Sequence, residues 1–194
     1  PVLAGLLLTL LSLQAQTDYM LQWPQFRGPF ASGIMENADL PVKWDIEKGE
    51  NIRWKIEVPG LGHSCPVIWD DKIFITTAIS GSGTDSLKVG LYGDIDDVKD
   101  NSVHKFRLYC FDKNTGEEIW SVTSHEGVPK TRRHTKASAA NPTPASDGKY
   151  VYAFFGSEGL YCYDFNGNLK WKKDFGPMNA GPFTDPEAEW GFAS

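Results

Sequence analysis

The sequence predicts an all-β fold assembled from repeated four-stranded units. Aromatic residues make up 13% of the 194 residues, and the chain contains 7 Trp, 19 Gly and 12 Pro. Aromatic and β-branched residues favour strands, and glycine and proline mark the turns between them. A strand–turn–strand pattern also occurs twice, and such internal repetition decides the architecture.

The repeated pattern is a strand that ends in Asp, a glycine turn, and a strand that carries Trp. The first copy consists of Leu108–Asp112, Gly116 and Trp120, and the second consists of Leu160–Asp164, Gly167 and Trp171. Glycine permits the positive φ that such a turn needs, and the Asp carboxylate before it is placed to accept backbone N–H bonds. We therefore expect both copies to be hairpins in which the Asp, Gly and Trp residues have structural roles.

Two further strands precede each hairpin. Residues 64–71 run into 72–77, and residues 141–148 run into 149–155, each pair through a short polar turn. The unit therefore has four strands, which is the size of a propeller blade. Because a single sheet of this kind has two apolar faces, neighbouring blades must stack face to face. The recurrence of one Trp per blade favours packing between blades over ligand stacking.

Counting the blades predicts a β-propeller that is incomplete in this sequence. Two blades occupy about residues 63–123 and 140–174, and a third is expected to begin near Trp190. Residues 51–58, which carry Trp54, have no partner strands before them, and we expect them to be the outer strand that closes the last blade. Propellers close with about 4–8 blades, so we expect a piece of a longer protein that exposes one apolar blade face.

The N-terminal residues differ from the rest of the chain. Residues 2–13 are almost uninterrupted Leu, Val, Ala and Gly, a run that is too short to span a bilayer but suits the h-region of a secretory signal. We expect residues 1–16 to be part of a signal peptide, 17–50 to be an extended segment and 51–194 to be the partial propeller. Export and the absence of a transmembrane segment follow from this interpretation.

Charge and cysteine content argue against several classes of function. The formal net charge of −6 disfavours binding to nucleic acid or to an anionic membrane. The three cysteines lack the C-x-x-C spacing that zinc, redox and haem sites use. Cys110 and Cys162 stand at equivalent positions of adjacent sheets, roughly 10 Å apart and beyond disulfide reach, so we expect buried thiols.

The repeat resembles the signature of PQQ-like β-propellers. In residues 108–120 the Asp, Thr-Gly and Trp stand at the spacing of that signature, and residues 160–171 match it without the Thr. Residues 23–29 and 40–44 are similar to the N-terminus of exported PQQ-binding-like repeat proteins. The resemblance covers about residues 22–194 and implies a propeller of the quinoprotein type.

The resemblance implies one of two functions. Quinoprotein dehydrogenases hold pyrroloquinoline quinone (PQQ) and Ca²⁺ in the propeller centre and oxidise alcohols or sugars, using a vicinal cysteine pair, a catalytic Asp and Asn, Asp or Glu calcium ligands. Other members, such as the lipoprotein propeller of the outer-membrane β-barrel assembly machinery, bind no quinone and scaffold other proteins. No two cysteines adjoin in this sequence, and no lipid-attachment cysteine follows the apolar run. We therefore expect no cofactor on the residues seen here, with PQQ and Ca²⁺ as the alternative.

Two insertions carry the candidate ligand-binding residues. Residues 81–105 interrupt the first blade, and residues 125–139 connect the two blades. The second insertion contains the densest positive charge, which we call the basic loop (residues 130–136): Lys130, Arg132, Arg133, His134 and Lys136. Such a cluster would grip a carboxylate, a phosphate or an acidic glycan, with Arg supplying bidentate geometry; the alternative is a solvated loop.

The first insertion is acidic. It contains Asp94, Asp96, Asp97 and Asp100. Oxygen ligands of this kind suit Ca²⁺, but the run lacks the D-x-D-x-D-G order and clustered acids in insertions are usually solvated. We assign no metal ligand and no catalytic residue, because His63 and His125 have no Ser or Cys partner at a motif spacing.

The sequence thus predicts an exported binding or scaffolding module in the envelope of a Gram-negative type bacterium, periplasmic or secreted. Its partner is expected to be a protein, a glycan or a small anionic ligand. The alternative is a quinoprotein dehydrogenase that depends on PQQ and Ca²⁺, so enzymatic activity stays open.

Overall fold

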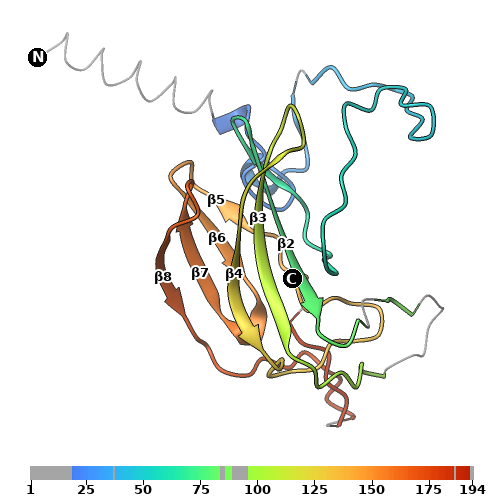
Figure 1. Ribbon diagram of the computed structural model, residues 1–194, viewed down its shortest axis with the longest axis vertical. Coiled ribbons are helices and arrows are strands. Elements are labelled where there is room, and N and C mark those ends of the chain that lie inside the picture. The colour runs from blue at the N-terminus through green and yellow to red at the C-terminus, as the bar shows by residue number, and fades with distance from the viewer. Residues whose placement is uncertain (1–18, 37, 84–85, 89–95, 186, 193–194) are drawn as a thin grey trace, which may run out of the picture.

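The computed structural model describes residues 19–192, except for 37, 84–85, 89–95 and 186, as two four-stranded antiparallel sheets (Figure 1). The first sheet contains β1 (Val67–Trp69), β2 (Lys72–Ser80), β3 (His104–Asp112) and β4 (Glu118–Gly127). The second contains β5 (Ala145–Ser146), β6 (Tyr150–Phe154), β7 (Leu160–Asp164) and β8 (Leu169–Lys173). Two 3-10 turns, η1 (Pro29–Ala31) and η2 (Gly156–Glu158), are also present. Each sheet follows sequence order, which confirms the predicted four-stranded units.

The two sheets repeat each other in register. In the first sheet Phe74 pairs with Cys110, and Cys110 pairs with Trp120. In the second sheet Tyr152 pairs with Cys162, and Cys162 pairs with Trp171. Each sheet has a β-bulge directly after its Cys. The sequence repeat therefore corresponds to a structural repeat, residue by residue.

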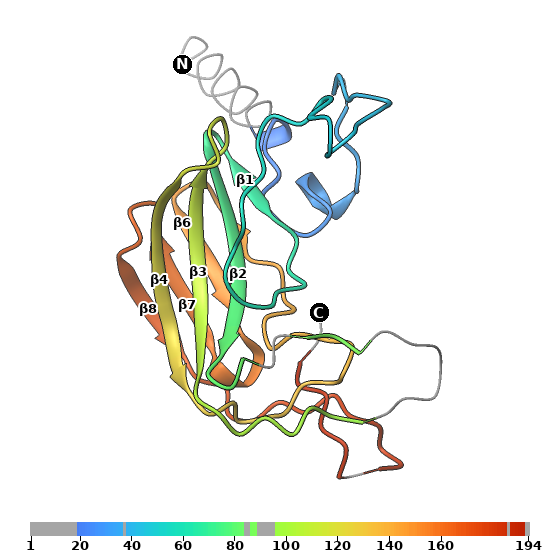
Figure 2. The same cartoon turned by 45° about the vertical axis from the view of Figure 1, so that its right-hand side comes forward.

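The core lies between the sheets. The first sheet contributes Val67, Phe74, Ala78, Phe106, Leu108 and Cys110, and the second contributes Val151, Ala153, Tyr161 and Tyr163. These side chains come from alternate positions of each strand, because successive side chains of a strand point to opposite faces. The two sheets therefore stack as neighbouring propeller blades do, which confirms the predicted fold class (Figure 2).

The opposite face of the first sheet is covered by the segment that carries Trp54. Tyr109 and Phe111 form a second, smaller cluster, against which Trp54, Ile56 and Val58 pack. This segment, residues 51–58, has no strand hydrogen bonds, whereas the sequence predicted a closing strand there. The reason is geometric: the segment lies across a sheet face rather than beside a sheet edge, so no strand is available for pairing.

The tryptophans join one structural unit to the next. The Trp120 indole Nε1 in the first sheet donates to the Phe165 carbonyl of the second at 2.9 Å, and its ring lies against Gly167. Trp54 repeats this arrangement on the first sheet: its Nε1 donates to the Lys113 carbonyl at 2.9 Å and its ring lies against Gly116. Trp54 therefore occupies, relative to the first blade, the place that Trp120 occupies relative to the second.

Trp171 is the third residue of this series and faces away from the first blade. Its side chain is 45% exposed, and its ring centroid lies 6.1 Å from that of Tyr152. Leu169, on the same strand, is also exposed. Among the described residues this face of the second blade has no glycine turn packed against it.

The turns that receive the tryptophans are held by their aspartates. Asp112 Oδ1 accepts the N–H groups of Asn114 and Thr115 at 2.7 and 2.9 Å, and Asp164 Oδ1 accepts those of Asn166 and Asn168 at 3.0 and 2.9 Å. Gly116 and Gly167 have φ values of 77° and 81°, which L-residues with side chains rarely adopt. Backbone hydrogen bonds from Thr115 and Asn114 lower the pKa of Asp112, because they stabilise the carboxylate.

The short turns and the long connections between strands lie at opposite ends of the sheets. The turns after β1, β3, β5 and β7 lie at one end, which we call the hairpin end (upper end in Figure 1). The described parts of the long connections, which fall within residues 81–103, 128–144 and 174–192, lie at the other end, which we call the loop end. A third blade was predicted to begin near Trp190, but the described residues after β8 contain no strand and fold back onto the loop end.

The N-terminal segment adds to the edge of the first sheet. Trp23 forms an isolated bridge with Ile68, and their N–H groups and carbonyls exchange hydrogen bonds of 3.0 and 2.8 Å. The predicted signal peptide, residues 1–16, lies outside the described residues. Within residues 19–192 as described, no helix has the length and apolarity that crossing a bilayer would require.

All three cysteines are free, which for Cys110 and Cys162 is as predicted. Cys110 and Cys162 are buried between strands, whereas Cys65 is partly exposed. Burial raises the pKa of the Cys110 thiol to about 12 and also raises that of Cys162, because the thiolate is poorly solvated there.

Candidate functional site

The candidate site is the loop end, where the two insertions pair with each other. Asp97 and His134 form an isolated antiparallel bridge. The Val98 N–H donates to the Arg133 carbonyl at 2.9 Å, and the Thr135 N–H donates to the Asp96 carbonyl at 3.3 Å. A short backbone ladder therefore joins the acidic insertion to the basic loop. The sequence predicted both insertions but not this pairing.

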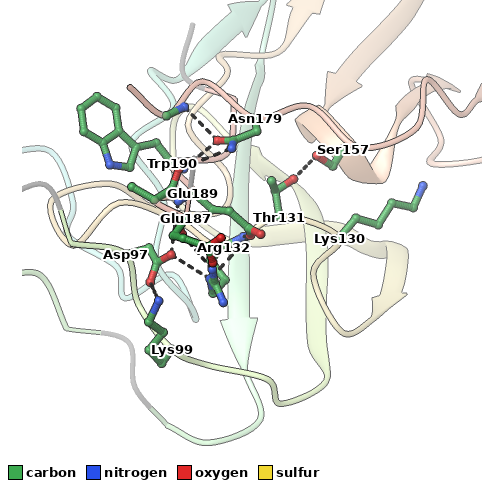
Figure 3. A network of polar contacts seen from close by, with 12 residues as sticks. Asp97, Lys99, Lys130, Thr131, Arg132, Ser157, Asn179, Glu187, Glu189 and Trp190 are labelled. Atoms are coloured by element: carbon green, nitrogen blue, oxygen red, sulfur yellow. Dashed lines mark hydrogen bonds and ion pairs between the residues drawn. The ribbon is translucent and has the colours of Figure 1, made fainter. Parts of the chain in front are cut away.

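Asp97 is the centre of the charged network at this end (Figure 3). Its side chain is 1% exposed and lies 2.8 Å from Arg132 Nε and 2.6 Å from Lys99 Nζ. The Glu189 N–H also donates to its Oδ2 at 3.2 Å. Burial alone would raise the pKa of Asp97, but the contacts with Lys99, the Glu189 N–H and Arg132 outweigh it and lower the pKa. Asp97 is therefore a charged residue that joins three segments.

The segment after β8 completes the network. Glu189 Oε2 accepts the Arg132 N–H at 2.7 Å, and Arg132 Nη2 donates to the Glu187 carbonyl at 3.2 Å. Asn179 Oδ1 accepts the Trp190 N–H at 3.1 Å, which closes this segment on itself. Residues 174–192 are thereby held to the basic loop, as Figure 3 shows.

The basic loop is also attached to the second blade. The Lys130 N–H donates to Glu158 Oε1 at 2.8 Å, and the Thr131 and Ser157 hydroxyls share a hydrogen bond. Glu158 is only 7% exposed, and burial raises the pKa of its carboxyl group. The loop is therefore fixed to η2 on one side and to the acidic insertion on the other.

The predicted ligand-binding residues are brought together, but most of their hydrogen-bonding groups contact the protein itself. Lys130 forms an ion pair with Asp174 at 2.7 Å, and Arg133 donates to the carbonyls of Ala137 and Ser86 at 2.8 and 3.1 Å. Further contacts in the loop join Arg132 to Asp97 and Glu189, the His134 ring to that of Trp190, and the Lys136 backbone N–H to His134 Nδ1. The cationic groups therefore organise the loop end, and their role in ligand binding stays a prediction.

A hollow of about 420 Å³ opens beside this network. Its lining is predominantly acidic and consists of Asp96, Asp97, Lys99, Thr135, Asp185, Glu187 and Ala188. Asp94, which the sequence grouped with these acids, lies outside the described residues. Within the described ranges no three His, Cys, Asp or Glu side chains are placed to hold a metal ion.

A cluster of Ser, Asp and His side chains at the base of the acidic insertion was missed by the sequence analysis. The hydroxyl groups of Ser80 and Ser82 donate to Asp100 Oδ2 at 2.6 and 2.9 Å. His104 Nε2 lies 3.6 Å from the same oxygen, and its Nδ1 lies 3.0 Å from the Ser102 carbonyl. The serines thus bond to the carboxylate rather than to the imidazole, so this cluster fastens the insertion and does not activate a nucleophile.

The described residues do not fit the quinone site of the dehydrogenases. The three cysteines are separate free thiols, and the described acids provide no group of three that would bind Ca²⁺. The residues of the two blades that face each other are packing residues.

Comparison with known proteins identifies the repeat. Residues 104–189, which run from the start of β3 beyond the end of β8, match a PQQ-repeat family model described as outer membrane protein assembly factor BamB. No curated protein matches the chain. The matched region contains the two Asp–Gly–Trp hairpins and the connection between them. Residues 104–189 are therefore similar to the PQQ-like repeat, and the two sheets that contain them are arranged as adjacent blades of a β-propeller.

Proposed function

We propose that this protein is an exported PQQ-like β-propeller protein that acts as a binding or scaffolding module in the cell envelope, with its loop end as the binding surface. The observation that carries the proposal is the tie between three separate connections through Asp97, Arg132 and Glu189. A surface fixed in this way loses little conformational entropy on binding. Binding residues are also commonly found on loops that a rigid scaffold positions.

Location in the envelope is supported by two independent features. Residues 2–13 have the apolarity and length of a signal h-region. The family model that matches residues 104–189 carries the name of an outer-membrane assembly factor. Together they favour a protein that works outside the cytoplasm as part of an assembly.

The chemistry of the loop end favours a protein partner. The acidic hollow and the basic loop lie side by side, so both signs of charge are present on one surface. Interfaces between proteins are commonly polar at the rim and complementary in charge. A glycan or a small anion would need free cationic donors, and those of Lys130 and Arg132 are already engaged with carboxylates.

Site-specific photo-crosslinking in cells tests the proposal. A photo-reactive residue at Glu187, exposed at the loop end, is expected to yield one discrete crosslinked species. The matched control carries the same residue at Lys149, which is exposed at the hairpin end. Crosslinks of equal yield from both positions, or only from Lys149, would contradict a binding role for the loop end.

The dehydrogenase alternative is tested separately, with the purified protein. Titration with PQQ and Ca²⁺, monitored by quinone absorbance and a dye-coupled alcohol or sugar assay, is expected to give neither saturable binding nor turnover. Saturable binding with turnover would replace the scaffolding proposal with an enzymatic one.

A further inference from the structure

A second concave feature lies between the blades and outside the loop-end hollow. It is a cleft of about 300 Å³ near the carboxyl ends of β4 and β8, where both strands reach the loop end (Figure 1). We call it the blade cleft; it is lined by His125, Lys130, Glu158, Tyr161, Lys172 and Asp174, with Lys173 beside them. Nearly all of its lining is titratable, which is unusual for a boundary between blades that is otherwise apolar.

The charges in the blade cleft do not cancel. Lys130 is already paired with Asp174, since its Nζ lies 2.8 and 2.7 Å from the two carboxylate oxygens. Lys172 and Lys173 form no ion pair with any described residue. The only other carboxyl group in the lining is that of Glu158, whose pKa is raised by burial so that its charge is disfavoured. Positive charge is therefore in excess.

His125 lies next to this excess of positive charge. Its ring lies against Phe106, with ring centroids 5.7 Å apart, so one side is apolar and fixed. Burial lowers the pKa of His125, and the nearby charges of Lys130 and Lys172 lower it further, opposed only by Asp174. No described residue forms a hydrogen bond with its ring nitrogens. The imidazole thus stands unpartnered in an electropositive, half-buried place.

The remaining walls are rigid. The Tyr161 hydroxyl donates to the Glu158 carbonyl at 2.9 Å, and Glu158 Oε1 accepts the Lys130 N–H at 2.8 Å. The Tyr161 hydroxyl proton is therefore not available to a ligand. The donors that stay available are His125 on β4 and Lys172 and Lys173 on β8. A group that binds here must accept hydrogen bonds from His125 and Lys172.

We propose that the blade cleft binds a small oxyanion, a phosphate or a carboxylate group, between His125 and Lys172. The volume admits an anion of this size together with water. An anion would hold the imidazole in its protonated form, and binding would strengthen as the pH falls through the pKa of His125. This inference goes beyond the proposed function, because it assigns a small-molecule site outside the loop-end surface.

NMR titration of the histidine side chains in the purified protein tests the site. The chain contains four His residues, so the imidazole signals of His125 can be assigned with a His125→Gln variant. Inorganic phosphate is expected to raise the pKa of His125 relative to chloride at equal ionic strength. Lys172→Gln is expected to weaken phosphate binding about tenfold, since one charged hydrogen bond is lost. Lys149→Gln, at the exposed hairpin end, is the matched control and should bind as the unmodified protein does.

Acetate and phosphate are compared to identify the anion. Stronger binding of phosphate indicates a phosphate site, and stronger binding of acetate indicates a carboxylate site. If His125 titrates identically in chloride, phosphate and acetate, or if Lys172→Gln binds as tightly as the control, the site does not exist. These outcomes are separate from the crosslinking result, so either proposal can fail alone.

Discussion

Replacement of Gly167 by Ala measures how tightly the two blades are joined. Gly167 has a φ of 81°, and a Cβ added there would lie 3.0 Å from Cδ2 of Trp120. The left-handed backbone costs an Ala residue about 1–2 kcal/mol. Displacing a packed aromatic ring costs about 1–3 kcal/mol more. We therefore expect Gly167→Ala to lower the free energy of unfolding by about 2–5 kcal/mol.

Trp120 has little freedom to move away. Its indole N–H is bonded to the Phe165 carbonyl at 2.9 Å, and its ring centroid lies 6.0 Å from that of Phe74. The added methyl group must therefore either break that hydrogen bond or separate the turn from the neighbouring blade. This is why the steric contribution is expected in addition to the backbone strain.

Gly176→Ala is the matched control. Its φ of 77° is nearly the same, and no heavy atom lies within 4 Å of an added Cβ. The control is expected to lose only the backbone contribution of about 1–2 kcal/mol. Urea unfolding curves of both variants give the comparison, because a midpoint shift at constant slope reports stability directly. Equal losses for the two variants would refute the contact between Trp120 and the Gly167 turn.

A double-mutant cycle sharpens the result. In a Trp120→Phe background the smaller ring leaves room for the methyl group, so the cost of Gly167→Ala should fall towards that of the Gly176→Ala control. A cost that is unchanged in this background would show that the two residues are not coupled.

Three further predictions concern single groups. Glu158→Gln should raise the urea midpoint at neutral pH and leave it unchanged in acid. Burial raises the folded-state pKa of Glu158, so the unmodified protein loses stability as the pH rises through that pKa. A reversed pH dependence would contradict the burial of this carboxyl group. Asp97→Ala should destabilise the loop end by about 3 kcal/mol, because it leaves Arg132 without its buried partner. Hydrogen exchange should accelerate in the basic loop but not in the strands. Unchanged exchange would show that Asp97 does not hold the network together. Cys65 should react with a thiol reagent well before Cys110 and Cys162, because burial disfavours their thiolates; equal rates under native conditions would contradict the packing.

The repeat was predictable because its signals are local. An Asp, a glycine at positive φ and a Trp define each hairpin; the Asp and Gly act within their own turn, and Trp120 acts on the turn of the next blade. The segment around Trp54 shows the limit of this reasoning. Its Trp docks on Gly116 as expected for an outer strand, but whether the segment is a strand depends on a neighbouring strand and not on its own residues.

The loop end was predicted in outline only. The sequence placed the basic loop in an insertion and grouped its cations, but the carboxylates that pair with Lys130 and Arg132 come from distant parts of the chain. Asp97 precedes the loop and Glu189 follows it, and no periodicity links either residue to Arg132. Glu158 is a similar case, since its surrounding residues, Gly156, Ser157 and Gly159, are typical of an exposed turn although its carboxyl group is buried. Tertiary contacts of this kind leave no local signal.

The functional account depends most directly on the loop end being the surface that a partner covers. Hydrogen–deuterium exchange of the protein, free and bound to the partner that crosslinking identifies, tests this without altering any residue. The account predicts that amides in residues 96–103, 128–136 and 174–192 gain protection on binding, whereas the hairpin turns at 113–117 and 165–168 do not. Protection gained at the hairpin turns and absent from the loop end would contradict it.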